Sequence, residues 1–403
     1  MEKTVRITFV GDIMCEKPLQ KAYETYGAEV FDRVFAQTKR LFSRSDYVVG
    51  NLETVFGGTA FPYTKELYRF NTPDVFASSL SRSGISLVTT ATNHCLDCGI
   101  TGLDRTIDVL DAHGIAHTGT WRRPEDRGVF VATLKDRRAA FLNYTYGTNV
   151  HETGVLLNDE DVLRVGLLKP QTFNLQTYEG KRAGKCRRAV SSSLSRVMDQ
   201  EARIRLKKAL GMPYNSVRVD HFDENELDPA YERRLLQELS EAKQRADLVV
   251  VCLHCGGQFN GAPGGLSRYF VRLFADNGAD AVICHHAHVV QPAEIIHGTP
   301  VAYGIGNYSI SPSSAYLLRD HLPEFAVAFH LTVDDLGVRP SFSVLKIIED
   351  RYGVPAAWPV PTLWDRLDLD GKTALLRDVN LIVSRLTGRD CGESSVKEEY
   401  VLG

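Results

Sequence analysis

The sequence predicts a layered α/β fold. Through the first 145 residues, and again from about residue 229, short apolar runs alternate with stretches of helical spacing. This order is typical of domains in which helices cover a sheet. Several of the apolar runs end in side chains with metal-binding chemistry. The chain has 403 residues, enough to bury a large core.

The first part of the chain supplies strands and helices in alternation. Pro73 and Gly84 mark the two ends of one helix, because proline is favoured at a helix start and glycine just after its end. The other expected helices span residues 30–42 and 102–112. The expected strands are residues 5–10, 47–50, 85–89, 129–134 and 139–144, the last two paired around a turn.

The pattern resumes in the last third of the chain. Helices are expected at 229–245 and 266–276, and strands at 247–253, 281–284, 301–303, 325–333 and 340–347. The last two form a hairpin around a turn that ends at Gly337. We expect one domain over residues 1–350 and a C-terminal helical extension and tail over 351–403. The polar tail from Gly388 is expected to be frayed.

Residues 149–228 interrupt the pattern and predict an insertion that is partly helical, with one amphipathic helix over 191–211. The segment is rich in lysine and arginine from Lys181 to Lys208. A charged run of this kind is more often a solvated helical cap. The alternative is a lid that gathers an anionic substrate.

Composition limits the classes of function. The net charge of −3 gives no basic surplus for nucleic-acid binding. No apolar run reaches the 18 residues that a membrane span needs. Eight cysteines are too few for a disulfide scaffold, and the N-terminus leads into a strand without a signal peptide. We therefore expect a cytoplasmic protein with reduced thiols. Nothing in the sequence indicates an oligomeric state.

The apolar runs deliver oxygen and nitrogen donors at five strand ends. In an open α/β sheet, ligands bind beyond the carboxyl ends of the strands, so these side chains should converge. Any single Asp or His here would more often be a turn residue or a structural histidine. Their recurrence at five strand ends favours one shared site. The candidates are Asp12, Glu53, Asn93, His254, His286 and His288.

This donor set predicts a centre for two divalent metal ions. Asp, Glu, Asn and His are hard to borderline ligands that suit Mn²⁺, Fe or Zn²⁺ alike. A carboxylate can bridge two cations about 3.5–4 Å apart, as in two-metal hydrolases. Such a pair makes hydroxide from a bound water near pH 7 and stabilises charge on the attacked group.

Two Cys-x-x-Cys pairs overlap these motifs, Cys95 with Cys98 and Cys252 with Cys255. The favoured interpretation is that they are small apolar side chains packed beneath the site, because free cysteine is among the most buried residue types. The alternative is a thiol ligand or a redox-sensitive group beside the metals.

The motifs also resemble a known family from about residue 4 to 310. They are Gly11–Met14, Gly50–Glu53, Ala91–Gly99, Leu253–Gly257, Gly278–Pro292 and Tyr303–Tyr308. In this order and spacing the sequence resembles the bacterial capsule-synthesis protein CapA family. That family is associated with poly-γ-glutamate and has a calcineurin-like metallophosphoesterase fold. The resemblance implies a four-layer α/β/β/α sandwich with the inserted cap.

The resemblance also implies roles. Asp12, Glu53 and His288 would hold a first metal. Glu53, Asn93, His254 and His286 would hold a second, with Glu53 bridging. His94 would face the substrate as general acid or phosphate contact, and Asp97 would orient it. An equally good interpretation makes Asp97 a helix N-cap. Asn307 lies in the family's Gly-Asn motif, with a less defined role.

The sequence departs from related patterns at four positions. Met14 occupies a position where the broader metallophosphoesterases often have a metal-binding histidine, so the first metal lacks one ligand. Cys255 and Gln258 replace the Trp and Glu usual in CapA-like proteins, and Cys284 replaces a Gly. These changes bear on the substrate more than on the metals.

Taken together, these features predict a metal-dependent hydrolase of a phosphate ester or of a γ-glutamyl or acyl-type bond. The expected substrate is an anionic small molecule or polymer. One alternative is a non-hydrolytic accessory protein of poly-γ-glutamate or capsule polymer synthesis or export. Another is a biosynthetic enzyme whose basic insertion binds the carboxylates of an acidic peptide.

Overall fold

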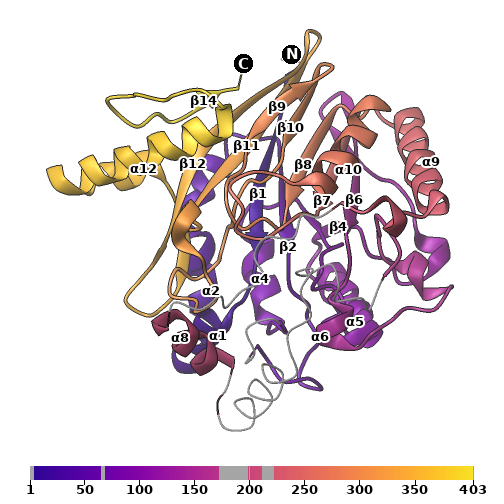
Figure 1. Cartoon of the computed structure of the whole chain (residues 1–403), viewed down its shortest axis with the longest axis horizontal. Helices are drawn as coiled ribbons and strands as arrows, with labels where there is room; N and C mark the ends of the chain where they lie inside the picture. The colour runs from indigo at the N-terminus through magenta and orange to yellow at the C-terminus, as the bar shows by residue number, and fades with distance from the viewer. Residues whose placement is uncertain (1–3, 65–68, 172–197, 199, 211–221, 403) are drawn as a thin grey trace.

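The computed structural model describes residues 4–64, 69–171, 198, 200–210 and 222–402. These residues form two β-sheets that face each other, with helices on their outer sides (Figure 1). The first sheet has the strand order β13-β12-β11-β1-β2-β3-β4, with β14 added beside β12. The second has the order β5-β6-β7-β8-β10-β9.

The strands of the first sheet are β1 (Val5–Ile13), β2 (Tyr47–Leu52), β3 (Leu87–Thr89), β4 (Ala116–Thr118), β11 (Phe325–Asp334), β12 (Gly337–Glu349), β13 (Pro355–Pro359) and β14 (Tyr400–Val401). Those of the second are β5 (Phe130–Leu134), β6 (Arg137–Thr145), β7 (Leu248–His254), β8 (Ala281–His285), β9 (Ala293–Ile296) and β10 (Thr299–Ala302). Within the first sheet β1 to β4 run parallel, and within the second β6, β7, β8 and β10 run parallel.

The helices are α1 (Lys17–Tyr26), α2 (Glu29–Phe35), α3 (Lys39–Phe42), α4 (Val75–Ser81), α5 (Gly99–Ala112), α6 (Val150–Thr153), α8 (Gln200–Ala209), α9 (Pro229–Arg245), α10 (Gly265–Asp276), α11 (Val360–Trp364) and α12 (Leu369–Thr387). Short 3₁₀ turns occur at Ala36–Thr38, Pro124–Asp126, Asp161–Arg164, Glu224–Glu226 and Arg319–His321.

Three buried apolar clusters create the four layers. The central cluster joins inward-facing residues of both sheets, such as Phe9 of β1 and Val250 of β7. A second cluster packs α1, α2 and α4 on the outer face of the first sheet, and a third packs α9 and α10 on the second. In Figure 1, α9 and α10 lie on the right of the molecule and α1 and α2 at the lower left. The predicted α/β/β/α sandwich is therefore present.

Most strand and helix predictions agree with this structure. The predicted helix 229–245 coincides with α9, and the predicted pairs β5–β6 and β11–β12 are antiparallel hairpins. The continuous helix expected over 30–42 is instead divided into α2, a 3₁₀ turn and α3. Within the described residues, no helix is long and apolar enough to cross a membrane.

Part of the basic insertion packs on the body of the protein. Ile204 of α8 is buried in the same cluster as α1 and α2. Thus α8 accounts for part of the helix expected over 191–211. The basic residues between 172 and 197 lie outside the described residues, so the choice between a solvated cap and a lid stays open.

The prediction of a frayed tail is wrong for the last residues described. Tyr400 of β14 is buried, and its ring stacks on Phe342 at 5.4 Å. Glu399 also forms an ion pair with Arg6 at 2.9 Å. The sequence beyond Gly388 is polar, but one aromatic side chain at its end is enough to fix it against the edge of the sheet.

Candidate metal centre

The six predicted ligands converge where strands of both sheets end. Asp12 lies near the end of β1, Glu53 directly follows β2, and Asn93 lies in the loop after β3. From the second sheet, His254 ends β7, and His286 and His288 follow β8. All six side chains are buried. The side chains therefore converge as predicted, at a place where strand ends of the two sheets meet.

Asp12 is fixed by its backbone as well as its side chain. The β1–β2 pairing shifts register between Val10 and Asp12. The Asp12 amide donates to the carbonyl of Gly306 at 3.3 Å, and its carbonyl accepts from the Tyr308 amide at 2.9 Å. Gly11 permits this contact, because a Cβ there would lie 2.1 Å from the Gly306 oxygen. One Asp12 oxygen, Oδ1, accepts a hydrogen bond from Asn51 Nδ2 at 2.8 Å.

Glu53 lies at the middle of the cluster, and its side chain makes no hydrogen bond to a described residue. Both of its carboxylate oxygens are buried and lack a hydrogen-bond partner among the described residues. Its Oε1 lies 3.3 Å from His254 Nε2 and 3.7 Å from His288 Nε2. A buried carboxylate surrounded by nitrogen donors, yet hydrogen-bonded to none of them, is suited to a bound cation.

We call Glu53, Asn93, His254 and His286 the second position. Their donor atoms are already close together. His254 Nε2 lies 2.8 Å from Asn93 Oδ1 and 3.1 Å from His286 Nδ1. The Asn93 side-chain nitrogen donates to Asn149 Oδ1 at 3.1 Å, which holds the Asn93 oxygen toward the histidines.

We call Asp12, Glu53 and His288 the first position. His288 Nδ1 lies 2.8 Å from Asn307 Oδ1 and 3.2 Å from Asp12 Oδ2. If Nδ1–H donates to Asn307, Nε2 is left facing Glu53 as a ligand atom. Asn307 itself donates to the His288 carbonyl at 2.8 Å, so the weakly defined residue of the Gly-Asn motif orients this ligand.

The donor atoms do not separate cleanly into a first and a second position. Donor atoms of Glu53, His286 and His288 lie within 4.8 Å of one another, and so do those of Asp12, Glu53 and His254. Both groups share Glu53, and both cut across the division that the family resemblance implies. The division between the two positions therefore stays a proposal.

Two of the histidines have a backbone conformation that is rare for residues other than glycine. The φ angles are 81° at His286 and 54° at His288. Each such residue costs on the order of 1–2 kcal/mol. Between them they turn the chain back toward Glu53 directly after β8, where a regular strand would alternate its side chains between two faces.

His94 and Asp97 form a pair beside the cluster. Nδ1 of His94 lies 2.7 Å from Asp97 Oδ2, while Nε2 lies 3.9 Å from Glu53 Oε1. The Phe70 ring packs against His94 at 4.4 Å, and the Phe70 amide donates to Asp97 Oδ2 at 2.6 Å. Asp97 does not cap α5, whose N-cap residue is Cys98 without a side-chain hydrogen bond. This favours the orienting role for Asp97.

The protonation preferences of the histidines differ across the cluster. Burial holds the pKa of His254 well below its usual value and lowers that of His286 to about 4. Burial would also lower the pKa of His288, but the neighbouring carboxylates of Glu53 and Asp12 raise it to about 9. The carboxylate of Asp97 likewise raises the pKa of His94 against the effect of burial.

The residues present fit a divalent cation. Asp12 Oδ2 and both Glu53 oxygens are buried without hydrogen bonds within the described part of the chain. Carboxylate, amide and imidazole donors surround them, a set that suits divalent metal ions. Three orphaned anionic oxygens in a buried site would be costly without a positive charge.

The cysteines near the site behave as packing residues. Cys95, Cys98, Cys252, Cys255 and Cys284 are all buried, and these five form no disulfide. Burial raises the pKa of the thiols of Cys95, Cys98 and Cys252 to about 12, which disfavours the thiolate that a metal would need. No described cysteine joins a candidate metal cluster.

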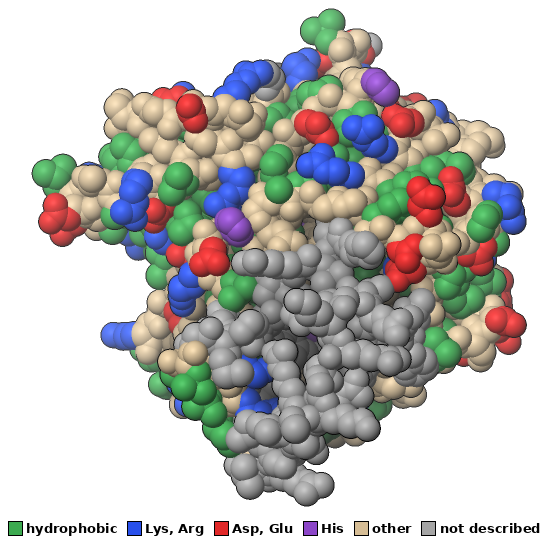
Figure 2. Space-filling view, in the orientation of Figure 1, with side chains coloured by type: hydrophobic (Ala, Val, Ile, Leu, Met, Phe, Trp, Pro, Cys, Tyr) green, Lys and Arg blue, Asp and Glu red, His purple; other side chains and the backbone are tan. Residues whose placement is uncertain are grey.

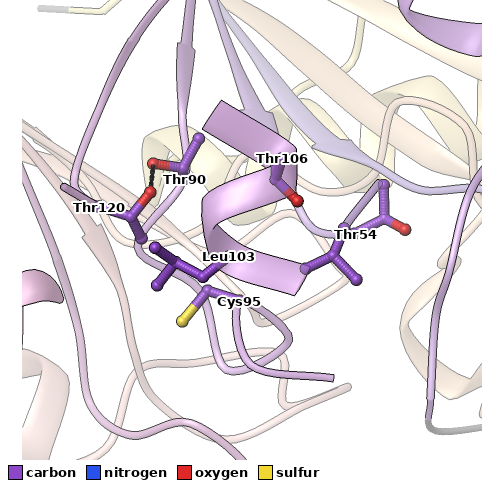
Figure 3. A pocket seen from close by; sticks show the side chains of 7 residues that line it. Thr54, Thr90, Cys95, Leu103, Thr106 and Thr120 are labelled. Carbon is purple, nitrogen blue, oxygen red and sulfur yellow. Dashed lines mark hydrogen bonds between the residues drawn. The ribbon is translucent and has the colours of Figure 1, made fainter. Parts of the chain in front are cut away.

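A small cavity of about 10 Å³ adjoins this region (Figure 3). Its lining includes Thr54 and Cys95, which follow Glu53 and His94 in the chain. Thr90 and Thr120, joined by a 2.8 Å hydrogen bond, form another part of the wall. The cavity holds at most a single water, so it is no substrate pocket.

Several contributing residues were not singled out from the sequence. Asn51 contacts both Asp12 Oδ1 and His254 Nδ1, the latter at 3.1 Å, and so links the two positions. Asn149 holds Asn93, and His285 lies 3.4 Å from Asp12 Oδ1. Asn51 and His285 lie inside the motifs quoted above, but only the register and the turns reveal where they point.

The face shown in Figure 2 carries charged side chains of both signs among the described residues. On the face shown in Figure 2, acidic and basic side chains are interspersed over the described residues and do not collect in one patch of a single sign. This distribution matches the net charge of −3.

The two facing sheets, the outer helices and the Asp, Glu, Asn and His cluster at the strand ends define the class of protein: a four-layer α/β/β/α sandwich with a candidate metal centre. The model of the family described as bacterial capsule synthesis protein PGA_cap matches residues 6–312. The chain therefore belongs to that family, as the motif resemblance predicted.

Individual relatives are distant. PGA biosynthesis protein CapA of Bacillus subtilis (strain 168) is 24% identical over 303 residues, which cover 75% of this chain and 62% of that protein. Capsule biosynthesis protein CapA of Bacillus anthracis is 22% identical over 310 residues, covering 75% and 59%. The chain thus spans about three fifths of the length of these curated relatives.

Among solved structures, a 5'-nucleotidase from Candida albicans SC5314 is similar with a TM-score of 0.39 and 12% identity. The match covers 94% of this chain and 57% of that one.

Proposed function

We propose that this protein is a metal-dependent hydrolase acting on a phosphate ester or a γ-glutamyl or acyl-type bond of an anionic substrate. The observation that carries the proposal is the buried Glu53, whose two unpaired oxygens lie among donors from both sheets. Two divalent cations held there would supply an activated water and would neutralise charge on the attacked group.

The protein's own residues would divide the work as follows. Asp12, Glu53 and His288 would hold one cation, and Glu53, Asn93, His254 and His286 the other. His94 turns Nε2 toward the centre while Asp97 holds Nδ1 at 2.7 Å. His94 would thus donate a proton to the leaving group or bind an oxygen of the substrate. Asp97 is a positioning residue that acts through His94.

The names of the relatives guide the choice of substrates to test. Proteins named for PGA and capsule biosynthesis make γ-glutamyl amides and acidic polymers reasonable candidates beside phosphate esters. A capsule-related substrate would be anionic, in agreement with a centre that uses cations to bind it.

The test begins with the purified full chain loaded with Mn²⁺ and a measurement of bound metal. Hydrolysis of a phosphomonoester, a phosphodiester and a γ-glutamyl anilide is then compared for wild type, Asp12→Ala and His254→Ala. His297→Ala is the matched control, because the His297 side chain is 81% exposed and remote from the centre. We expect the two site variants to lose about 10³-fold in kcat/KM on the substrate that is cleaved.

The outcomes separate the candidate functions. Bound metal without hydrolysis of any substrate class would overturn the hydrolase and favour the non-hydrolytic accessory protein. No bound metal and no hydrolysis would overturn the metal centre as well. Replacing Asp97 with Asn should leave metal content unchanged and lower kcat about 10- to 100-fold, because the Asp97 side chain contacts His94 and the Phe70 amide but none of the candidate ligands.

A further inference from the structure

His285 is a buried histidine at the centre for which the ligand sets above have no role. It is the last residue of β8 and is 2% exposed. Its Nδ1 has no hydrogen-bond partner among the described residues. Leaving a buried polar atom unpaired costs about 1–3 kcal/mol, so this nitrogen requires an explanation.

The position of that nitrogen relative to Asp12 suggests one. His285 Nδ1 lies 3.4 Å from Asp12 Oδ1, and the other oxygen of Asp12 has no hydrogen bond. Two donors bound to one cation at about 2.0–2.2 Å lie about 2.8–3.6 Å apart in octahedral or tetrahedral geometry. The observed separation is what two ligands of a shared ion would show.

The backbone explains how two consecutive histidines reach one centre. Successive side chains of a strand point to opposite faces. In the β7–β8 pairing, His285 lies opposite His254, which is itself a candidate ligand. The chain then departs from the strand at His286, where φ is 81°, and His286 Nδ1 comes within 3.1 Å of His254 Nε2. His285 therefore faces Asp12 while His286 faces the second position.

The first position needs such a donor. Asp12, Glu53 and His288 supply three ligands, and residue 14 is a methionine. The thioether of Met14 is a soft ligand, poorly matched to the cations that carboxylates select. Its backbone is already engaged, since the Met14 amide donates to Ser309 Oγ at 2.8 Å and the Ser309 hydroxyl donates to the Met14 carbonyl at 2.7 Å.

We infer that His285, through Nδ1, is the ligand that completes the first position together with Asp12, Glu53 and His288. The ligand that Met14, directly after β1 of one sheet, does not provide is thus supplied by the last residue of β8 in the other sheet. The inference rests on the proposed metal centre but not on the reaction that the centre performs.

The experiment measures Mn²⁺ binding by the full chain, without any substrate. Free Mn²⁺ is followed by its EPR signal during titration, and pulsed EPR on protein with ¹⁵N-labelled histidine counts the imidazole nitrogens coupled to each bound ion. Wild type, His285→Ala and the surface control His297→Ala are compared, with thermal unfolding in EDTA as the check on folding. A double variant, His285→Ala with Met14→His, returns a histidine to residue 14.

We expect wild type and the control to bind two ions. His285→Ala should bind one ion as before and the other at least about 100-fold more weakly, with one fewer coupled nitrogen. Recovery of the second ion by the double variant would support the inference. Two ions bound with unchanged affinity by His285→Ala would overturn it. So would weaker binding with an unchanged number of coupled nitrogens, because His285 would then act only by orienting Asp12.

These outcomes are distinct from a failure of the proposed function. If the wild type binds two ions, His285→Ala binds one, and no substrate is hydrolysed, the role of His285 as a ligand is supported and the proposed hydrolase is overturned. If the wild type hydrolyses a substrate and His285→Ala binds both ions as tightly as wild type, the proposed hydrolase stands and His285 is not a ligand.

Discussion

The two halves of the candidate centre are prepared for metal in different ways. At the second position, His254 and His286 have pKa values below the usual range, so both rings are neutral at pH 7. At the first, His288 has its pKa raised to about 9 beside Asp12 and Glu53, so without a cation it carries a proton. Apart from Glu53, which both positions share, the second position consists of neutral donors, whereas at the first position a protonated His288 is paired with Asp12 and Glu53 and must lose its proton before a cation binds. We therefore expect the second position to fill first.

The largest effect should come from the residue that both halves share. Glu53→Gln keeps the shape but removes the central charge, and we expect both ions to be lost and kcat/KM to fall by about 10³-fold or more. In EDTA the same variant should be as stable as wild type or more stable, by up to about 1–3 kcal/mol, because it removes an unpaired buried carboxylate. Calorimetry with and without Mn²⁺ measures both effects. Full occupancy in the variant would show that the halves do not depend on one bridge.

A smaller effect should distinguish the first position from the second. The Asn51 side chain contacts donors of both positions, whereas the Asn307 side chain is hydrogen-bonded to His288. Asn51→Ala should weaken both Mn²⁺ steps about 10- to 100-fold, and the matched variant Asn307→Ala only the weaker step. Mn²⁺ titration followed by EPR resolves the two steps. Equal effects of the two variants on both steps would contradict the comparison.

The smallest effect concerns stability on the side of the first position. Burial raises the pKa of Glu16 to about 7, although Ser311 and Ser314 donate hydrogen bonds to it. Between about pH 4.5 and pH 7 the unfolded chain ionises Glu16 while the folded protein keeps it protonated, so stability falls as pH rises. The Glu16→Gln variant lacks this dependence of stability on pH.

The free energy of unfolding of Glu16→Gln, relative to wild type, should therefore increase on the order of a few kcal/mol from pH 4.5 to pH 7. Urea unfolding at several pH values, with EDTA present, measures it. A difference that does not change with pH would show that Glu16 is ionised in the folded protein as readily as in the unfolded chain.

The sequence predicted which candidate ligands converge better than it predicted their surroundings. Asp12, Glu53 and His254 were recognisable because each closes a buried apolar run, and parallel strands deliver their carboxyl ends to one region. His285 was not recognisable as a candidate, because the alternation of side chains along a strand places it on the face opposite to His286. Only the positive φ of His286 brings both to the centre. Asn51 likewise reads as an ordinary strand residue until the register places it between Asp12 and His254.

The same limit explains the errors in the fold. The spacing of residues 30–42 fits one helix, but the chain bends at Ala36–Thr38, so that Val34 and Leu41 still face one buried cluster. The tail was expected to fray because its composition is polar. Tyr400 overrides that composition through long-range packing on Phe342, which no local pattern records.

The hydrogen bond between Asp12 and Gly306 has a consequence for how the protein matures. It joins residues that are separated by most of the chain, and the centre it supports needs donors from both ends of that interval. Contacts of such long sequence separation form late in folding. The ribosome must therefore have synthesised residue 306 before the hydrogen bond to Gly306 can fix Asp12 in place. A chain that arrests earlier would present its carboxylates and histidines to the cell as loose chelators. The transfer of metal from a fluorescent indicator to the refolding protein would then measure when this last step of assembly occurs.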